Sequence, residues 1–125
     1  MSRWLVDSHA LLWWLSDDPA LSPAARTAIA DPTNEPLVSA VTIWEIAIKR
    51  SLGKLSAPDD LPDVILTEGF HTLAIDAQDA WRVRALPLHH RDPFDRLLIA
   101  QALTQQLPVI TADAQFAAYD VDVHW

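Results

Sequence analysis

The chain has 125 residues, half of them hydrophobic, and carries 17 Asp and Glu against 9 Lys and Arg, for a formal net charge of −8. This length and apolar content predict a single domain over residues 1–125 with its own core, and exclude a disordered chain. The charge disfavours a nucleic-acid coat protein, and the absence of cysteine excludes disulfides, zinc-thiolate sites and thiol catalysis. Asp7 comes too early for a signal peptide and no long apolar run occurs, so we expect a cytoplasmic protein without membrane segments.

Short apolar runs alternate along the chain with longer helical patterns. Four runs without polar alternation are typical of parallel strands covered on both faces, and a fifth alternates like an edge strand: residues 4–6, 37–38, 72–75, 109–111 and 121–125. Helices are predicted at residues 11–15, 22–31, 41–52, 61–68, 76–84 and 94–106, with end signals at Ser22-Pro23, Gly53, Gly69, Asp76 and Asp92-Pro93. The alternation predicts a three-layer α/β fold with a mostly parallel sheet.

Oxygen-bearing side chains follow the predicted strands or begin the next helix, which is where open parallel sheets bind ligands. They are Asp7, Ser8, Ser39, Glu45, Asp76, Asp92, Asp95, Thr111 and Asp113. Two unit charges of like sign about 4 Å apart repel by roughly 4 kcal/mol at an effective dielectric of about 20. Converging carboxylates would therefore recruit a hard divalent cation such as Mg²⁺ or Mn²⁺, which favours hydrolytic phosphoryl chemistry. With two glycines in the whole chain, a glycine-rich phosphate loop is excluded.

Several of these acids also suit a purely structural role. Asp7 after a strand and Asp92 before Pro93 fit helix N-caps, and Asp113 fits a turn. Asp76 meets the same criterion as Asp7, and only the order of the strands can decide whether it faces a shared site. The N-cap interpretation is retained for Asp92.

Glu45 and Asp95 lie within predicted helices. Glu45 is three residues after Thr42, the spacing of a capping box, and four before Lys49, the spacing of an ion pair, so spacing alone favours a structural role. The helix that contains Asp95 is apolar almost all round and must be buried. A carboxylate at the start of a buried helix needs a partner, for which a metal ion is suitable.

Four motifs occur in register along the chain. They are Leu5-Val6-Asp7-Ser8-His9, the segment VTIWEIA at residues 41–47, the segment HRDPFDRLLIA at residues 90–100, and Ile110-Thr111-Ala112-Asp113. Together they resemble PIN-domain ribonucleases, most closely the VapC-type toxins of bacterial type II toxin–antitoxin systems, from Val6 to Trp125. The resemblance implies a three-layer fold with a five-stranded sheet of order 3-2-1-4-5, flanked by helices. In that order the first and fourth strands are neighbours, and Asp76 is removed to the far edge.

The same resemblance implies a catalytic site built from carboxylates. Its acidic quartet, which would bind one or two Mg²⁺ or Mn²⁺ ions, is Asp7, Glu45, Asp95 and Asp113. The Thr111 hydroxyl would support this site, with Ser8 and Ser39 as weaker candidates for the same role. The implied activity is metal-dependent endoribonuclease cleavage, in which water attacks an RNA phosphodiester in line.

Three predictions concern side chains outside the quartet. His89 and His90 precede an N-cap and are interpreted as loop residues, so no histidine is assigned as the base. Arg91 and Arg96 are candidates for contacting RNA phosphate or a carboxylate of an antitoxin. The tryptophans in apolar helical stretches are expected in the core: Trp13, Trp14 and Trp44.

The resemblance also implies partners, namely an RNA substrate, a cognate antitoxin and a second copy of the chain in a homodimer. One alternative is a catalytically inactive PIN-like module that binds RNA or protein, which the complete quartet disfavours. Another is an aspartate-nucleophile phosphatase or a phosphoryl-receiving domain. His9 stands where the phosphatase has a second Asp, and no lysine follows Lys54 as the receiver requires, so both fit poorly.

Overall fold

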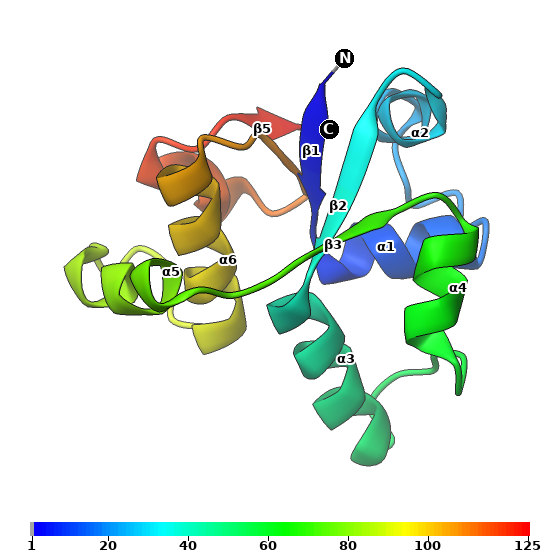
Figure 1. The fold of residues 1–125 in the computed structure, drawn as a ribbon, viewed down its shortest axis with the longest axis horizontal. Coiled ribbons are helices and arrows are strands. Elements are labelled where there is room, and N and C mark those ends of the chain that lie inside the picture. The colour runs from blue at the N-terminus through cyan, green and yellow to red at the C-terminus, as the bar shows by residue number, and fades with distance from the viewer. Residues whose placement is uncertain (1) are drawn as a thin grey trace.

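The computed structural model describes residues 2–125 and contains one five-stranded sheet of order β3-β2-β1-β4-β5 (Figure 1). Its strands are β1 (Arg3–Val6), β2 (Glu35–Ser39), β3 (His71–Leu73), β4 (Val109–Ile110) and β5 (Val123–His124). All four strand pairings are parallel. The predicted fold class and strand order are therefore confirmed.

Helices connect the strands at nearly the predicted positions. They are α1 (Ser8–Leu15), α2 (Pro23–Ala30), α3 (Ala40–Ser51), α4 (Leu61–Thr67), α5 (Ala77–Arg82) and α6 (Pro93–Gln105), with short 3-10 helices η1 (Val83–Ala85) and η2 (Ala114–Tyr119). Ser22, Asp76 and Asp92 are the N-caps of α2, α5 and α6, as their sequence signals predict. The capping box expected at Thr42 is wrong, because α3 begins earlier and the Ser39 hydroxyl accepts the Val41 N–H.

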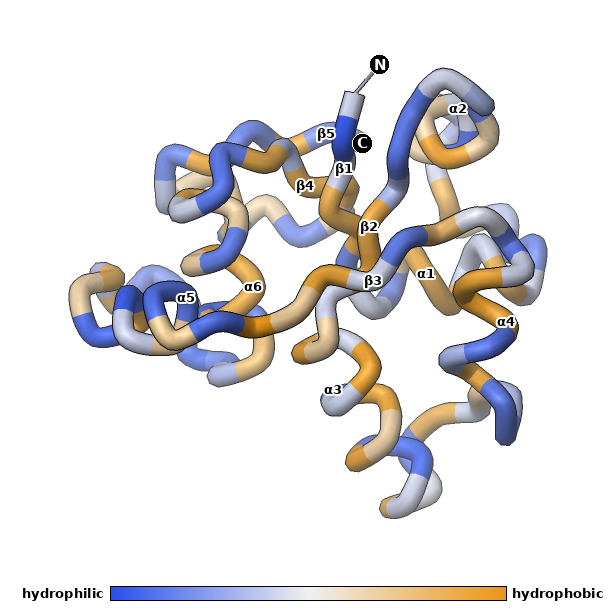
Figure 2. The backbone as a smooth tube through the Cα atoms, in the orientation of Figure 1, coloured by the Kyte–Doolittle hydropathy of each residue, from blue (hydrophilic) through white to orange (hydrophobic). Residues whose placement is uncertain are grey.

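Two apolar clusters cover the two faces of the sheet and complete the three layers. Successive residues of β1, β2 and β4 alternate between them, so that Val6 and Ile110 belong to the cluster with α1, α2 and α4. Leu5 and Val109 belong to the cluster with α6 and η2. In Figure 2 the tube is accordingly hydrophobic where β1 and β2 run into the centre of the molecule. This double coverage explains why the strands lack polar alternation.

The tryptophans differ in their burial. Trp13 and Trp14 pack partly buried against the cluster around α1, as predicted. The prediction for Trp44 is wrong, since its side chain is 55% exposed and its ring packs edge-on against Phe94, with ring centroids 4.9 Å apart. Val41 and Ile46 of the same helix are in the core, so the apolar pattern of α3 is borne out except at Trp44, which lies on its exposed side beside α6. Across residues 2–125, no helix combines the length and apolar character needed to cross a membrane.

Candidate active site

Asp7 and Thr111 leave the carboxyl ends of two neighbouring strands. Val6 of β1 and Ile110 of β4 are partners in the parallel register, so the residues that follow them lie side by side. The Thr111 hydroxyl donates a 2.5 Å hydrogen bond to Asp7 Oδ2, and Asp7 Oδ1 accepts the Ala10 N–H at 2.8 Å as the N-cap of α1. Asp7 is therefore both a cap and a member of the site, with both carboxylate oxygens held in place.

Asp113 is joined to the same group through Thr111. The Asp113 N–H donates to Thr111 Oγ1 at 3.0 Å, while Asp113 Oδ1 accepts the Gln115 N–H at 2.9 Å and so caps η2. The turn role that the sequence allows for Asp113 is thus present. Its second oxygen, Oδ2, is left to face the site.

Asp95 enters from the first turn of α6. Asp92 caps this helix by accepting hydrogen bonds from the N–H groups of Phe94 and Asp95, at 2.8 Å and 3.2 Å. These bonds fix the first turn of α6 and the position of Asp95 in it. Burial raises the pKa of Asp95 to about 7, and the charges of Asp92, Glu45 and Asp7 add to this, while His90 opposes it. A pKa this high means that the surroundings of the Asp95 carboxylate do not fully compensate its negative charge.

Asp7 shows the same effect. Burial raises its pKa, the hydrogen bonds from Thr111 and Ala10 oppose the rise, and the Glu45 charge adds to it. Perturbed acids that share a pocket are a mark of functional sites. Asp7, Asp95 and Asp113 line one cavity of about 380 Å³ together with His9 and Trp13.

Glu45 approaches this pocket from α3. It is 4% exposed, and its carboxylate accepts a 2.6 Å hydrogen bond from Lys49 Nζ, so the predicted ion pair is confirmed. This hydrogen bond raises the pKa of Lys49, and the charges of Asp92 and Asp95 add to the effect. Glu45 also raises the pKa values of Asp7 and Asp95, which indicates that its charge reaches the site. One lysine therefore compensates one member of the quartet.

His90 is the site residue that sequence reasoning missed. It lies in the expected loop, yet its side chain is only 11% exposed and its Nε2 is 2.9 Å from Asp113 Oδ2 and 3.1 Å from Asp95 Oδ2. In the described part of the chain, His90, Asp95 and Asp113 form a cluster of metal-ligating residue types with one donor atom each within 4.8 Å of the others. The available signal was its position two residues before the Asp92 cap, and that spacing does not show where the loop folds.

The two serines predicted to support the site differ in their environment. Ser8, the first residue of α1, is buried beside Asp7 in the chain. Ser39 is completely buried, and its hydroxyl donates to Gln101 Oε1 while accepting the Val41 N–H. Ser39 therefore joins α3 to α6, and its hydroxyl proton is not directed at the quartet.

The two arginines also differ, and the structure gives Arg96 a role that the sequence did not predict. Its guanidinium donates to one hydroxyl and four carbonyl oxygens at 3.0 to 3.4 Å: Tyr119, Val83, Leu86, Pro87 and His90. Arg96 thus ties residues 83–90 to α6 and η2, and its contact with RNA or an antitoxin stays a prediction. Arg91 is exposed and can make such a contact.

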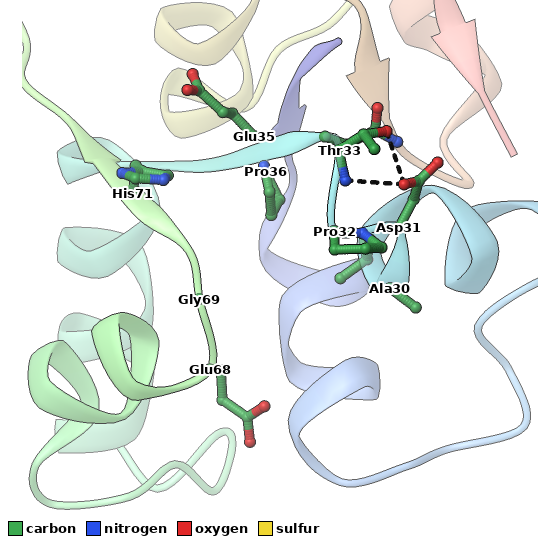
Figure 3. Close-up of a pocket in the computed structure, with 11 residues that line it drawn as sticks. Ala30, Asp31, Pro32, Thr33, Glu35, Pro36, Glu68, Gly69 and His71 are labelled. Atoms are coloured by element: carbon green, nitrogen blue, oxygen red, sulfur yellow. Dashed lines mark hydrogen bonds between the residues drawn. The ribbon is translucent and has the colours of Figure 1, made fainter. Parts of the chain in front are cut away.

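A larger cavity, of about 630 Å³, lies at the amino ends of β2 and β3 (Figure 3). Its acids do not converge, since Glu35 and Glu68 point in different directions in Figure 3. Asp31 accepts both the N–H and the O–H of Thr33, at 2.9 Å and 2.7 Å, and these bonds lower its pKa. The acids with raised pKa values, Asp7 and Asp95, therefore lie in the smaller cavity.

Comparisons with known proteins agree with this geometry. A family model described as "PIN domain" matches residues 4–122. Ribonuclease VapC22 of Mycobacterium tuberculosis (strain ATCC 25618 / H37Rv) is 29% identical over 122 residues, covering 95% of this chain and 93% of that protein.

Solved structures share the fold. VapBC2 from Rickettsia felis, bound to a DNA fragment from its promoter, superposes with a TM-score of 0.71 at 10% identity, covering 97% of this chain and 96% of that one. DNA-bound VapBC from Salmonella typhimurium gives a TM-score of 0.71 at 19% identity, covering 98% and 97%. The fold expected from the four sequence motifs is thereby confirmed.

Proposed function

The chain belongs to the PIN-domain family, and from this premise we propose that it is a metal-dependent endoribonuclease, the toxin of a VapBC-type toxin–antitoxin pair. One observation carries the proposal: burial raises the pKa values of both Asp7 and Asp95 in one cavity at the carboxyl ends of neighbouring strands. Buried carboxylates that lack enough internal positive charge gain stability from a cation. The name of the ribonuclease relative supports RNA as the substrate.

The donor set fits a hard divalent cation. Asp7, Asp95 and Asp113 line the cavity, and Glu45 adds charge from α3, so these four residues would hold Mg²⁺ or Mn²⁺. When bound, the cation would offset charge on the phosphodiester transition state and lower the pKa of water. The raised pKa values of Asp7 and Asp95 support such a binding site.

Residues around the quartet hold the acids in position for this chemistry. Thr111 contacts both Asp7 and Asp113 through one hydroxyl, which couples the two strand ends. Asp92 sets the first turn of α6 and hence the position of Asp95, and Lys49 orients Glu45. Such preorganisation is what a hydrolytic site needs, because the acids do not have to rearrange during the reaction.

The proposed partners are RNA, an antitoxin and a second copy of the chain in a homodimer. With a net charge of −8, the protein would bind RNA mainly where a cation reverses the local charge, so we expect metal-dependent RNA binding. The structural relatives are VapBC assemblies, which supports an antitoxin as partner. The exposed Trp44, which pairs with Phe94, offers an aromatic anchor for a protein partner.

The test of this function is cleavage of structured RNA by the purified protein with Mg²⁺, with Mn²⁺ and with EDTA. Wild type is expected to cleave only with a cation, and Asp7→Asn is expected to be inactive. RNA binding without cleavage by wild type would instead favour the inactive PIN-like module. For the toxin role, induced expression should arrest bacterial growth, and co-expression of the cognate antitoxin should relieve the arrest. Arrest that persists in Asp7→Asn would contradict this role.

A further inference from the structure

The His90 ring occupies the gap between two members of the quartet. Its Nε2 is within hydrogen-bond distance of both Asp113 Oδ2 and Asp95 Oδ2, at 2.9 Å and 3.1 Å. An imidazole nitrogen at this place can either bind a cation as a ligand or donate its own N–H to the carboxylates. The two roles require opposite tautomers of the ring, so the other ring nitrogen decides between them.

That other nitrogen, Nδ1, faces a donor. The backbone N–H of Asp92 points at His90 Nδ1 at 3.2 Å, which requires a lone pair on Nδ1 and assigns the ring proton to Nε2. Metal-ligating histidines have the reverse arrangement, because they donate the second ring N–H to a carboxylate, a carbonyl or water. The ring is therefore set as a donor toward Asp95 and Asp113.

The loop around His90 holds the ring in this orientation. The His90 N–H donates to the Tyr119 hydroxyl at 2.6 Å, and the His90 carbonyl accepts from Arg96 at 3.2 Å. The ring packs perpendicular to Phe116, with an interplanar angle of 87°. These three contacts hold the backbone N–H, the carbonyl and the ring of His90 in place. The Nε2–H of His90 therefore has a defined direction.

On the basis of the proposed function, we propose that His90 is a positioning residue and not a metal ligand. In the metal-free protein its ring takes the position between Asp95 and Asp113 that the cation would take. Its Nε2–H bridges Asp95 and Asp113 when no cation is bound, which keeps two repelling carboxylates together. Because the same two Oδ2 atoms would face a cation, the hydrogen bonds of His90 compete with cation binding. His90 thereby keeps the two carboxylates together in the absence of a cation and lowers their affinity for metal.

The decisive measurement is the dissociation constant for Mn²⁺, obtained by electron paramagnetic resonance of the free ion. Removing the donor with His90→Leu should tighten Mn²⁺ binding by roughly fivefold, the equivalent of one net hydrogen bond. The conservative His90→Gln, which keeps an N–H at similar reach, should stay near wild type. His89→Leu is the matched control, since His89 is exposed and packs on Tyr119 outside the quartet. Unchanged or weaker binding in His90→Leu would overturn the proposal.

A second measurement needs no variant. Long-range proton–nitrogen NMR correlations of the metal-free wild type should show His90 with its proton on Nε2, and Mn²⁺ bound to wild type should show no imidazole nitrogen coupling. A proton on Nδ1, or such a coupling, would identify a ligand and refute the inference. The tautomer in metal-free protein is independent of RNA cleavage, so failure of the proposed function and failure of this inference give different results.

Discussion

The sheet has a cavity at each end, and the pKa values of the acids in the two cavities shift in opposite directions. At the amino ends of β2 and β3, Asp31 accepts two hydrogen bonds from Thr33, which lower its pKa. At the carboxyl ends of β1 and β4, burial raises the pKa values of Asp7 and Asp95. The comparison teaches that the size of a cavity does not show how far the acids in it are stabilised. The smaller cavity holds acids that local hydrogen bonds do not fully stabilise, and a bound cation can supply what they lack.

The largest expected effect is on RNA cleavage, which should depend on an acid of the smaller cavity and not on an acid of the larger one. Asp95→Asn should reduce RNA cleavage by on the order of a hundredfold or more, because it removes a charge proposed to hold the cation. Asp31→Asn, the matched change in the larger cavity, should leave cleavage unchanged. Initial rates on one RNA substrate with saturating Mn²⁺ measure both. Equal losses in the two variants would mean that the distinction between the cavities is false.

Cation binding should stabilise the protein through the smaller cavity alone. At a free Mn²⁺ concentration about 100 times the dissociation constant, the free energy of unfolding should rise by about 2.7 kcal/mol. Thermal or urea unfolding with and without Mn²⁺ measures this increase. It should persist in Asp31→Asn and be lost in Asp113→Asn. An increase that survives in Asp113→Asn would place the cation elsewhere.

The link between the two strand ends can be tested at Thr111. Thr111→Val keeps the shape of the side chain but removes the hydroxyl that contacts Asp7 and Asp113, so cleavage should fall by roughly tenfold. The pKa of Asp7 should rise further, since the lost hydrogen bond opposed the effect of burial. Thr33→Val removes the corresponding hydroxyl beside Asp31 and should not affect cleavage. Rates and the carboxyl titration by NMR decide between these outcomes.

A further effect is on stability as a function of pH. Burial raises the pKa of Asp95 to about 7 in the folded protein, against an ordinary value of 3.8 for an exposed Asp, so the folded state binds the proton more tightly. Without a cation, this acid should therefore lower stability progressively as pH rises from about 4 to 7. Asp95→Asn should flatten that slope, measured by urea unfolding in EDTA, whereas Asp31→Asn should leave it in place. A slope unchanged in Asp95→Asn would show that burial does not perturb this acid.

Much of the fold could be predicted from the sequence, because the signals act over a few residues. Apolar runs without alternation predict buried parallel strands, and the caps at Ser22, Asp76 and Asp92 predict helix starts that the structure confirms. The pair of Glu45 and Lys49 follows from helical spacing alone. The strand order came from the resemblance to PIN domains, since local patterns do not specify which strands are neighbours.

The sequence by itself determined the elements, their caps and the supply of acids, whereas the tertiary structure decided which side chains meet. Thr111 reaches Asp7 across 104 residues because β1 and β4 are neighbours in the sheet. His90 enters the site because Arg96 and Tyr119 hold its loop, and Ser39 is directed toward Gln101 because α3 packs on α6. These contacts join residues far apart in the chain, and periodicity and spacing carry no information about them. The packing of the elements therefore determines which acids share one buried cavity and how far local hydrogen bonds compensate their charge.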